Sequence, residues 1–128
     1  MMKKRSHFKG RYKPRNPEKY RGNVNSIIWR SSWERLFMMY CDKHPNILEW
    51  NSEEMAIPYQ FEGKDRNYYP DFWIRMINED DCVVEKIIEI KPYYQKRWAQ
   101  NKAKWKEAVR CCDENGYEFQ VLTEKELF

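Results

Sequence analysis

The chain has 128 residues, of which 41% are hydrophobic, 16% aromatic and 34% charged, with a net charge of +4 at pH 7. That length and apolar content are enough for one compact core but not for two, so we expect one folded domain. No apolar run approaches the length of a membrane span, and the basic start lacks the apolar stretch of a signal peptide. The 4 cysteines show no zinc-binding spacing and there are only 2 histidines, so reduced thiols in a cytosolic protein are the simplest interpretation.

Positive charge is concentrated at the start of the chain. Residues 1–21 contain nine lysines and arginines and one glutamate, a net charge of +8, so the remaining residues carry −4. We predict an extended basic N-terminal arm over residues 1–25, which orders only on a partner, and a folded domain over residues 26–128. A basic arm on an acidic body favours a polyanionic partner, and a solvated tail that only aids solubility is the alternative. The arm's aromatic residues could dock on the body or stack on bases; they are Phe8, Tyr12 and Tyr20.

The first predicted helix begins at Ser31 or Ser32 and runs to about His44. Glu34 stands three residues after Ser31, which is the spacing of a capping box, and Pro45 ends the helical pattern. Glu34 lies off the centre of the apolar stripe, so its carboxylate is available for another role. The stripe itself follows helical spacing and consists of Trp33, Leu36, Phe37 and Tyr40.

Three predicted strands follow this helix. Residues 56–61 form the first strand, residues 62–67 a turn and residues 68–76 the second strand, so that the two strands make a hairpin. An acidic turn at residues 78–81 leads to a third strand over residues 82–91, which is rich in valine and isoleucine.

The rest of the chain adds a long helix, a fourth strand and a short helix. The long helix covers residues 94–115 and stops at Gly116, the residue type best suited to end a helix. Residues 117–122 form the fourth strand, and a second capping box opens the last helix at Thr123. The whole order indicates a mixed α/β (α+β) fold. The buried side of the long helix is marked by Trp98, Trp105, Ala108, Val109 and Cys112.

Two short motifs suggest a chemistry. In the third strand the side chains alternate, so Glu89 and Lys91 point to one face while Ile90 points to the other. Asp71 ends the sequence Tyr69-Pro70-Asp71 on the neighbouring strand of the predicted hairpin. Pro70 restricts the backbone before Asp71 and helps to fix the direction of its side chain.

These residues match what hydrolysis of a phosphodiester requires. Mg²⁺ held by two carboxylates offsets the charge of the phosphate, and Asp71 and Glu89 are the candidate ligands, with the backbone carbonyl of Ile90. Lys91 can polarise the phosphate, or hold or deprotonate the water. Glu34 can orient a metal-bound water or help to hold a second ion. Ligands that are all oxygen atoms favour Mg²⁺ or Mn²⁺ over zinc.

Each motif alone has an ordinary explanation. A Glu-x-Lys sequence on a strand is often a surface ion pair, an aspartate after proline is usually a turn residue, and Glu34 could serve only as a helix cap. Their occurrence together, in an order that one small site requires, favours the catalytic interpretation. The predicted catalytic residues are Glu34, Asp71, Glu89 and Lys91.

Further residues are placed to contact DNA. Arg30 flanks Glu34 and could touch phosphate, and pairing on the helix surface is the alternative. Tyr69 could face a groove, and the basic side of the long helix could lie on DNA or only face solvent. The predicted DNA-binding residues are Lys3, Lys4, Arg5, Lys9, Arg11, Lys13, Arg15, Arg30, Tyr69, Lys96 and Arg97.

The chain resembles the PD-(D/E)xK nuclease superfamily. Within it, the resemblance is greater to the head-completion nucleases of T4-like phages and to the related TnsA-type endonucleases. The resemblance covers about residues 19–127 and is carried by residues 29–34, 56–59, 69–74, 88–92 and 116–124. It implies a restriction-endonuclease-like core, in which helices flank a mixed four-stranded sheet. It also implies a metal-dependent cut in double-stranded DNA, linked to head completion before the tail joins.

The resemblance further implies a place in the host cytoplasm or on the virion, with capsid or neck proteins as partners and no membrane. A single small site cuts one strand, so a double-strand break would need a homodimer or two sequential nicks. Two alternatives stay open. The chain could be a DNA-binding head or neck protein with a vestigial nuclease fold, or a TnsA-like or homing-type endonuclease that cuts a defined sequence.

Overall fold

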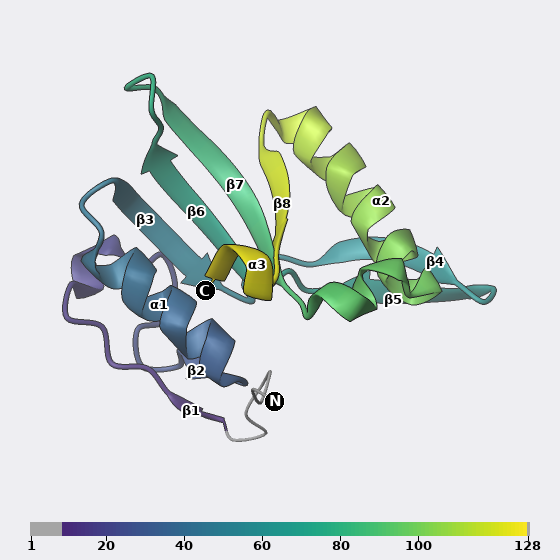
Figure 1. The fold of residues 1–128 in the computed structure, drawn as a ribbon, viewed down its shortest axis with the longest axis horizontal. Helices are drawn as coiled ribbons and strands as arrows, with labels where there is room; N and C mark the ends of the chain where they lie inside the picture. Colours follow the sequence, from purple (N-terminus) through teal and green to yellow (C-terminus); the bar gives the residue numbers. More distant parts are fainter. Residues whose placement is uncertain (1–8, 128) are drawn as a thin grey trace.

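The protein is built around a four-stranded mixed sheet, seen in a computed structural model that describes residues 9–127 (Figure 1). The sheet consists of β3 (Ile47–Ser52), β6 (Phe72–Ile77), β7 (Val83–Ile90) and β8 (Glu118–Leu122), in the order β3-β6-β7-β8. β3 pairs antiparallel with β6, and β6 with β7, while β8 lies parallel to β7. The predicted mixed four-stranded sheet is confirmed.

The parallel pair β7 and β8 needs a crossover connection, and α2 (Ala99–Asn115) supplies it. Gly116 ends α2 in the left-handed region at φ 73°, as the sequence predicted. The predicted start at residue 94 is corrected, because Tyr93–Arg97 form a 3-10 turn, η2, and Trp98 has extended backbone angles. Ala108 and Cys112 are buried as expected, whereas Trp98 and Val109 are about half exposed.

A separate hairpin consists of β4 (Ile57–Phe61) and β5 (Lys64–Tyr68). Its turn contains only Glu62 and Gly63, both at positive φ, as in the type I′ turns that suit two-residue hairpins. The predicted turn over residues 62–67 and the predicted partner strand over 68–76 are therefore wrong. The strand predicted there is two strands, β5 and β6, which are interrupted at Pro70 because proline has no N–H to donate to a ladder.

The strand β3 was not predicted, and it takes the place in the core sheet that the sequence assigned to residues 56–61. A bulge between Ile47 and Glu49 breaks its regular alternation, which explains why its pattern is weak. Ile47 and Trp50 are nonetheless fully buried against the sheet's main core.

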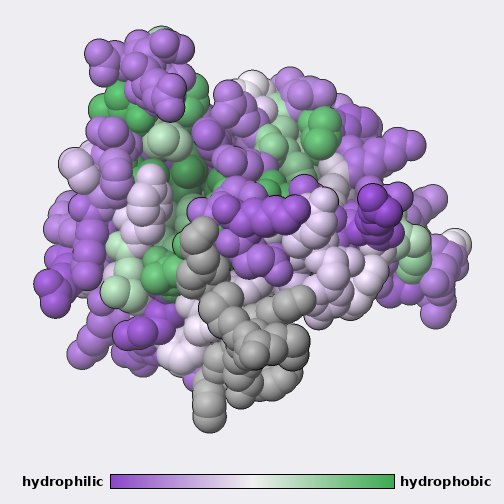
Figure 2. Space-filling model, viewed as in Figure 1, coloured by the Kyte–Doolittle hydropathy of each residue, from purple (hydrophilic) through white to green (hydrophobic). Residues whose placement is uncertain are grey.

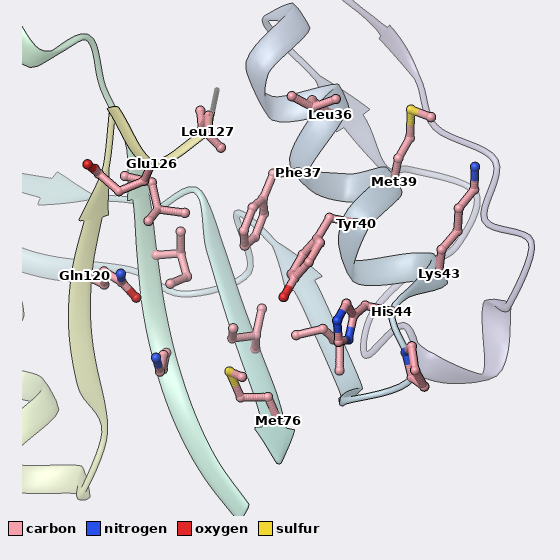
Figure 3. Close-up of a pocket in the computed structure, with 16 residues that line it drawn as sticks. Leu36, Phe37, Met39, Tyr40, Lys43, His44, Met76, Gln120, Glu126 and Leu127 are labelled. Carbon is pink, nitrogen blue, oxygen red and sulfur yellow. The ribbon is translucent and has the colours of Figure 1, made fainter. Parts of the chain in front are cut away.

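The helix α1 (Ser32–Lys43) covers one face of this sheet. Trp33 and Phe37 are buried as predicted, but Leu36 and Tyr40 are exposed, so the buried stripe lies further round the helix. Because α1 covers only part of the face, an apolar groove of about 800 Å³ remains between α1, the sheet and α3 (Glu124–Leu127) (Figure 3). Figure 2 shows hydrophobic residues gathered between α1 and the sheet. None of the predicted catalytic residues lines this groove.

The segment before α1 packs on the body from residue 9 onward. β1 (Gly10–Arg11) pairs with β2 (Ile28–Trp29), and a 3-10 turn, η1 (Pro17–Lys19), follows β1. Tyr12 and Tyr20 are buried with edge-to-face contacts to the ring of Trp50, at centroid distances of 6.1 and 4.7 Å. The expectation of an extended arm that orders only on a partner is therefore corrected for residues 9–25, while Phe8 and the residues before it lie outside the described part.

A buried carboxylate holds this segment in place. Asp42 of α1 accepts hydrogen bonds from the Tyr12 hydroxyl at 2.7 Å and from the backbone N–H groups of Arg15 and Asn16 at 2.8 and 2.9 Å. Burial raises the pKa of Asp42, but these hydrogen bonds outweigh that effect and the pKa is lowered overall.

A second, smaller core lies between α2 and the β4–β5 hairpin, where Ile57, Tyr59, Tyr68 and Ala108 are buried together. The predicted capping box at Thr123 opens α3, since its backbone N–H donates to Glu126 Oε1 at 2.8 Å. None of the described helices combines the length and apolar character that a bilayer crossing requires.

Candidate active site

The predicted catalytic carboxylates meet where β6 begins and β7 ends. Phe72 of β6 stands opposite Ile88 of β7 in the antiparallel register, so the preceding Asp71 lies beside Glu89. The Ile90 backbone N–H donates to Asp71 Oδ2 at 2.7 Å and fixes the direction of this side chain. The sequence placed Asp71 next to the strand that carries Glu89, as the structure shows, but the predicted hairpin with residues 56–61 does not form.

Glu89 and Lys91 share one face of β7, as the alternation predicted. The Lys91 ammonium lies 3.7 Å from Glu89 Oε2. The Glu89 side chain is almost completely buried, with 2% of the residue exposed, while Lys91 is partly open to solvent. A buried carboxylate is costly unless it has a cationic partner, and Lys91 is the cation that the structure provides. Ile88 and Ile90 pack in the main core on the other face.

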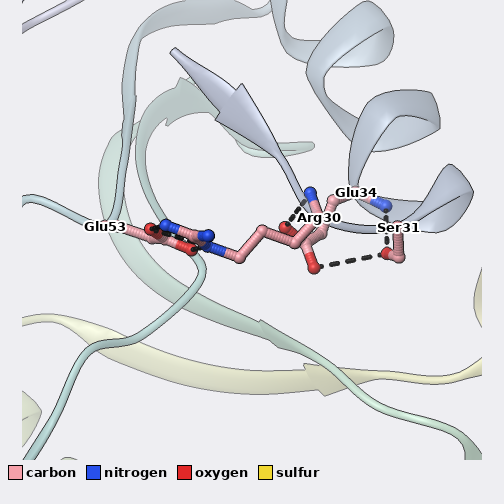
Figure 4. A network of polar contacts seen from close by, with 4 residues as sticks. All are labelled: Arg30, Ser31, Glu34 and Glu53. Carbon is pink, nitrogen blue, oxygen red and sulfur yellow. Dashed lines mark hydrogen bonds and ion pairs between the residues drawn. The ribbon is translucent and has the colours of Figure 1, made fainter. Parts of the chain in front are cut away.

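Glu34 is brought to the same place by the start of α1. Its carboxylate accepts hydrogen bonds from the Arg30 backbone N–H and from the Ser31 hydroxyl, both at 3.2 Å (Figure 4). The Glu34 N–H in turn donates to Ser31 Oγ at 3.2 Å, which completes the capping box. Capping and catalysis are therefore not alternatives here, because the cap fixes a buried carboxylate at the edge of the site.

The structure adds Glu53, which sequence reasoning missed. Carboxylate oxygens of Glu34, Glu53 and Asp71 lie within 4.8 Å of one another. Glu53 follows β3 directly, has a left-handed backbone at φ 56°, and its N–H donates to the Asp71 carbonyl at 3.2 Å. Glu53 could have been predicted only by recognising β3 in the sequence, because the pairing of β3 with β6 places Glu53 beside Asp71.

Arg30 is held by Glu53 in a two-pronged ion pair. Its Nε lies 2.9 Å from Glu53 Oε1 and its Nη2 lies 3.2 Å from Oε2, and this pairing raises the pKa of the guanidinium (Figure 4). The sequence predicted Arg30 as a DNA contact, with pairing on the helix surface as the alternative. The structure shows pairing, with a partner outside the helix.

The crowding of carboxylates changes the acidity of the site. Burial raises the pKa of Asp71 well above its usual range, and the negative charge of Glu89 raises it further. The Ile90 N–H and the Lys91 charge offset part of this rise. Burial and the charges of Glu89 and Asp71 also raise the pKa of Tyr68. The Tyr68 hydroxyl is buried and has no hydrogen bond of standard geometry among the described residues.

The charges at this site suit a divalent cation. Four carboxylates face two cations, so with every group ionised the formal charge is −2, which one divalent ion would balance. All the donors are oxygen atoms, which fits Mg²⁺ or Mn²⁺. Two of the predicted ligands, Asp71 and Glu34, lie together with Glu53 in one group of carboxylates. Glu89 lies beside Asp71, and the Ile90 backbone N–H donates to Asp71. The six side chains are Glu34, Glu53, Asp71 and Glu89 with Arg30 and Lys91.

The residues predicted to bind DNA occupy two described regions. Lys96 and Arg97 are exposed in η2, directly after the strand that carries Lys91, and Tyr69 is exposed two residues before Asp71. Lys3, Lys4 and Arg5 lie outside the described residues. Lys9, Arg11, Lys13 and Arg15 are exposed in the segment before α1, as is Arg30 directly before that helix.

Comparison with known proteins identifies a family for this architecture. The sequence profile described as "TnsA-like endonuclease N terminal" matches residues 44–124, more than half of the chain. The head completion nuclease of Enterobacteria phage T4 is 34% identical over 144 aligned positions, which cover 94% of this chain and 93% of that protein. The chain belongs to the TnsA-like family. This family is part of the PD-(D/E)xK superfamily, so the resemblance stated from the sequence is confirmed.

The family range and the site coincide. Residues 44–124 include Glu53, Asp71, Glu89 and Lys91, so the TnsA-like match spans the carboxylates contributed by the sheet. Glu34 precedes this range, but the similarity to the T4 protein spans nearly the whole chain and therefore extends over α1.

Proposed function

We propose that this protein is a metal-dependent DNA endonuclease that hydrolyses phosphodiester bonds. The observation that carries the proposal is the assembly of Asp71, Glu89 and Lys91 at the junction of β6 and β7, with Glu34 and Glu53 beside Asp71. The family and the T4 relative are both described as nucleases, which supports the same reaction.

Each residue of the site has a separate role in this proposal. The carboxylates of Asp71, Glu89, Glu34 and Glu53 would hold Mg²⁺ or Mn²⁺, which when bound offsets phosphate charge and makes water a stronger nucleophile. The Ile90 N–H keeps Asp71 aimed at this position. Lys91, held beside Glu89 and partly open to solvent, donates to a phosphate oxygen or holds the attacking water.

We infer a role in phage assembly from the T4 relative, which is named a head completion nuclease. In this proposal the protein acts on packaged double-stranded DNA in the host cytoplasm or on the virion, before the tail joins, and a capsid or neck protein brings it to its substrate. The described residues form one such site, so a double-strand break would require a homodimer or two successive nicks.

The decisive test is cleavage of supercoiled plasmid in Mg²⁺ or Mn²⁺ with EDTA controls. Lys91→Ala and Glu89→Gln should each lower the cleavage rate by about 100-fold or more, because each removes a group that acts on the transition state or its metal. Glu85→Gln is the matched control, since Glu85 lies on the same face of β7 four residues away from Glu89.

Full Mg²⁺-dependent cleavage by Glu89→Gln would contradict the proposal. If the parent protein bound DNA in a salt-sensitive way but never cut it, the vestigial head or neck protein would replace the nuclease. Cleavage confined to a defined sequence would instead favour a TnsA-like or homing-type enzyme with the same site.

A further inference from the structure

The segment that follows the catalytic lysine exposes three large aromatic side chains, Tyr93, Tyr94 and Trp98. Tyr94 and Trp98 are 53% and 52% exposed, and their rings meet edge to face at a centroid distance of 5.9 Å. The sequence predicted Trp98 as part of the buried side of α2, so its exposure is a property of the fold. Aromatic side chains of this size normally contribute most when buried, so two adjacent exposed rings call for a binding partner.

The same segment is strongly basic. Residues 91–106 contain six lysines and arginines and no aspartate or glutamate, although the chain as a whole is nearly balanced. Lys96 and Arg97 lie between the two rings in the sequence and are both exposed. A run of positive charge with no acid in the same stretch of sequence favours a polyanion, and its combination with exposed rings distinguishes this surface from an ordinary solvated helix face.

The segment is anchored on both sides. The Tyr93 N–H donates to Glu124 Oε1 at 2.7 Å, and the Lys125 ammonium lies 3.5 Å from the centroid of the Tyr93 ring. On the other side the Asn101 amide donates to the Gln95 carbonyl at 2.9 Å. The rings of Tyr94 and Trp98 are therefore presented by a braced turn, which lowers the entropic cost of binding.

The position of this turn connects it with the active site. Tyr93 is two residues from Lys91, so their Cα atoms are at most roughly 7.6 Å apart. The start of α2 also contacts the hairpin, because the Gln100 amide donates to the Tyr59 hydroxyl at 2.9 Å. Figure 1 shows η2 between the end of β7 and the start of α2, beside the β4–β5 hairpin.

We propose that Tyr94 and Trp98 form an aromatic platform that stacks on unpaired bases of a single-stranded segment beside the cut, while Lys96 and Arg97 hold its phosphates. Bases in a duplex are already stacked on one another, so exposed protein rings stack most readily on bases that have left the helix. The inference rests on the proposed nuclease function and defines its substrate class: DNA with unpaired nucleotides, such as a flap, a gap or a frayed end.

The test measures binding in EDTA, so that no cleavage takes place. Fluorescence anisotropy compares a labelled oligothymidylate with a blunt duplex of the same length, at moderate salt. Tyr94→Ala and Trp98→Ala should each weaken binding to the single strand by about fivefold or more, and binding to the duplex by less than about twofold. Trp98→Phe keeps a flat ring and should restore most of the single-strand affinity.

Tyr40→Ala is the control, because Tyr40 is an aromatic residue of similar exposure that lines the groove of α1. Circular dichroism melts show whether each variant is folded. Equal losses on both DNAs, or no loss on the single strand, would overturn the proposal, and so would absence of binding to the oligothymidylate. If the parent binds the single strand through these rings but never cuts DNA with Mg²⁺, the nuclease proposal fails while the platform stands.

Discussion

Asp71 is the residue on which the two halves of the site depend. One of its oxygens accepts the Ile90 N–H, and a carboxylate oxygen lies within 4.8 Å of oxygens from Glu34 and Glu53. Burial and the charge of Glu89 raise its pKa. Ionised Asp71 is therefore unfavourable in the metal-free protein, which fits the proposal that this site binds a cation.

Asp71 therefore contributes a stability to the metal-free protein that is greater at lower pH. The folded-state pKa of Asp71 is above its unfolded value, so its protonation contributes stability that is fully present below the unfolded pKa and is lost as the pH rises through the folded pKa. We expect Asp71→Asn to raise the melting temperature in EDTA at neutral pH by a few degrees, about 1 kcal/mol, since asparagine removes the charge and can still accept the Ile90 N–H.

The same variant should lose the rise in melting temperature that Mg²⁺ gives the parent protein. Thermal melts of both proteins with EDTA and with Mg²⁺, at neutral and mildly acidic pH, check the two effects. If Asp71→Asn were less stable than the parent in EDTA at neutral pH, the charge of Asp71 would not destabilise the metal-free protein.

At the scale of elements, the segment that carries β1 and η1 belongs to the fold. The Asp42 carboxylate of α1 accepts three hydrogen bonds from it. Lys19 of η1 reaches the C-terminal end of α1, where its ammonium donates to the carbonyls of Cys41 and His44 at 2.7 and 3.0 Å. A cation at the C-terminal end of a helix also interacts favourably with the helix dipole. Removing residues 1–21 would therefore unfold part of the core as well as remove positive charge.

Asp42→Ala should destabilise the protein by about 2–4 kcal/mol, because it leaves the Tyr12 hydroxyl and two N–H groups without their acceptor. The folded pKa of Asp42 is lowered, so its contribution is present above the unfolded pKa and is lost as the pH falls through the folded pKa. The difference from the parent in urea melts should thus shrink below about pH 4. Asp80→Asn, in the exposed turn after β6, is the control, and an equal effect there would contradict the assignment.

At the scale of the whole molecule, the apolar groove and the Glu89–Lys91 pair lie on opposite faces of the sheet. The apolar groove lies between α1 and one face of the sheet, whereas Glu89 and Lys91 project from the other face of β7. The exposed cations Lys96 and Arg97 lie directly after β7. This separation leaves the side of the site open to a polyanion.

The basic start of the chain is expected to add to DNA affinity through phosphate contacts alone. Replacing Lys3 and Lys4 by alanine should reduce the slope of log affinity against log salt by up to about 1.8 on a duplex, because each phosphate contact contributes about 0.9. Replacing Lys43 and Lys64 removes the same net charge elsewhere and should change the slope less. Binding titrations over a range of salt concentrations measure it, and identical slopes for the two double variants would refute a specific role for the start of the chain.

Much of the site could be read from the sequence because its signals are local. A capping box places Glu34 at the start of a helix, and strand alternation places Glu89 and Lys91 on one face, whatever the rest of the chain does. The helix stop at Gly116 and the cap at Thr123 are local in the same sense, since each depends on the backbone angles or hydrogen bonds of a few neighbouring residues.

What only the tertiary structure decided is which segments meet. The bulged strand β3, its pairing with β6 and the left-handed Glu53 after it follow from contacts between residues far apart in the chain. The exposure of Trp98 has the same origin, because a helical pattern shows which side chains share a face but not whether another element covers that face. The sequence by itself named Glu34, Asp71, Glu89 and Lys91 as candidates for one site, whereas long-range pairing determined that Asp71 lies beside Glu89 and that Glu53 joins them, since such pairing is selected by the packing of the whole core.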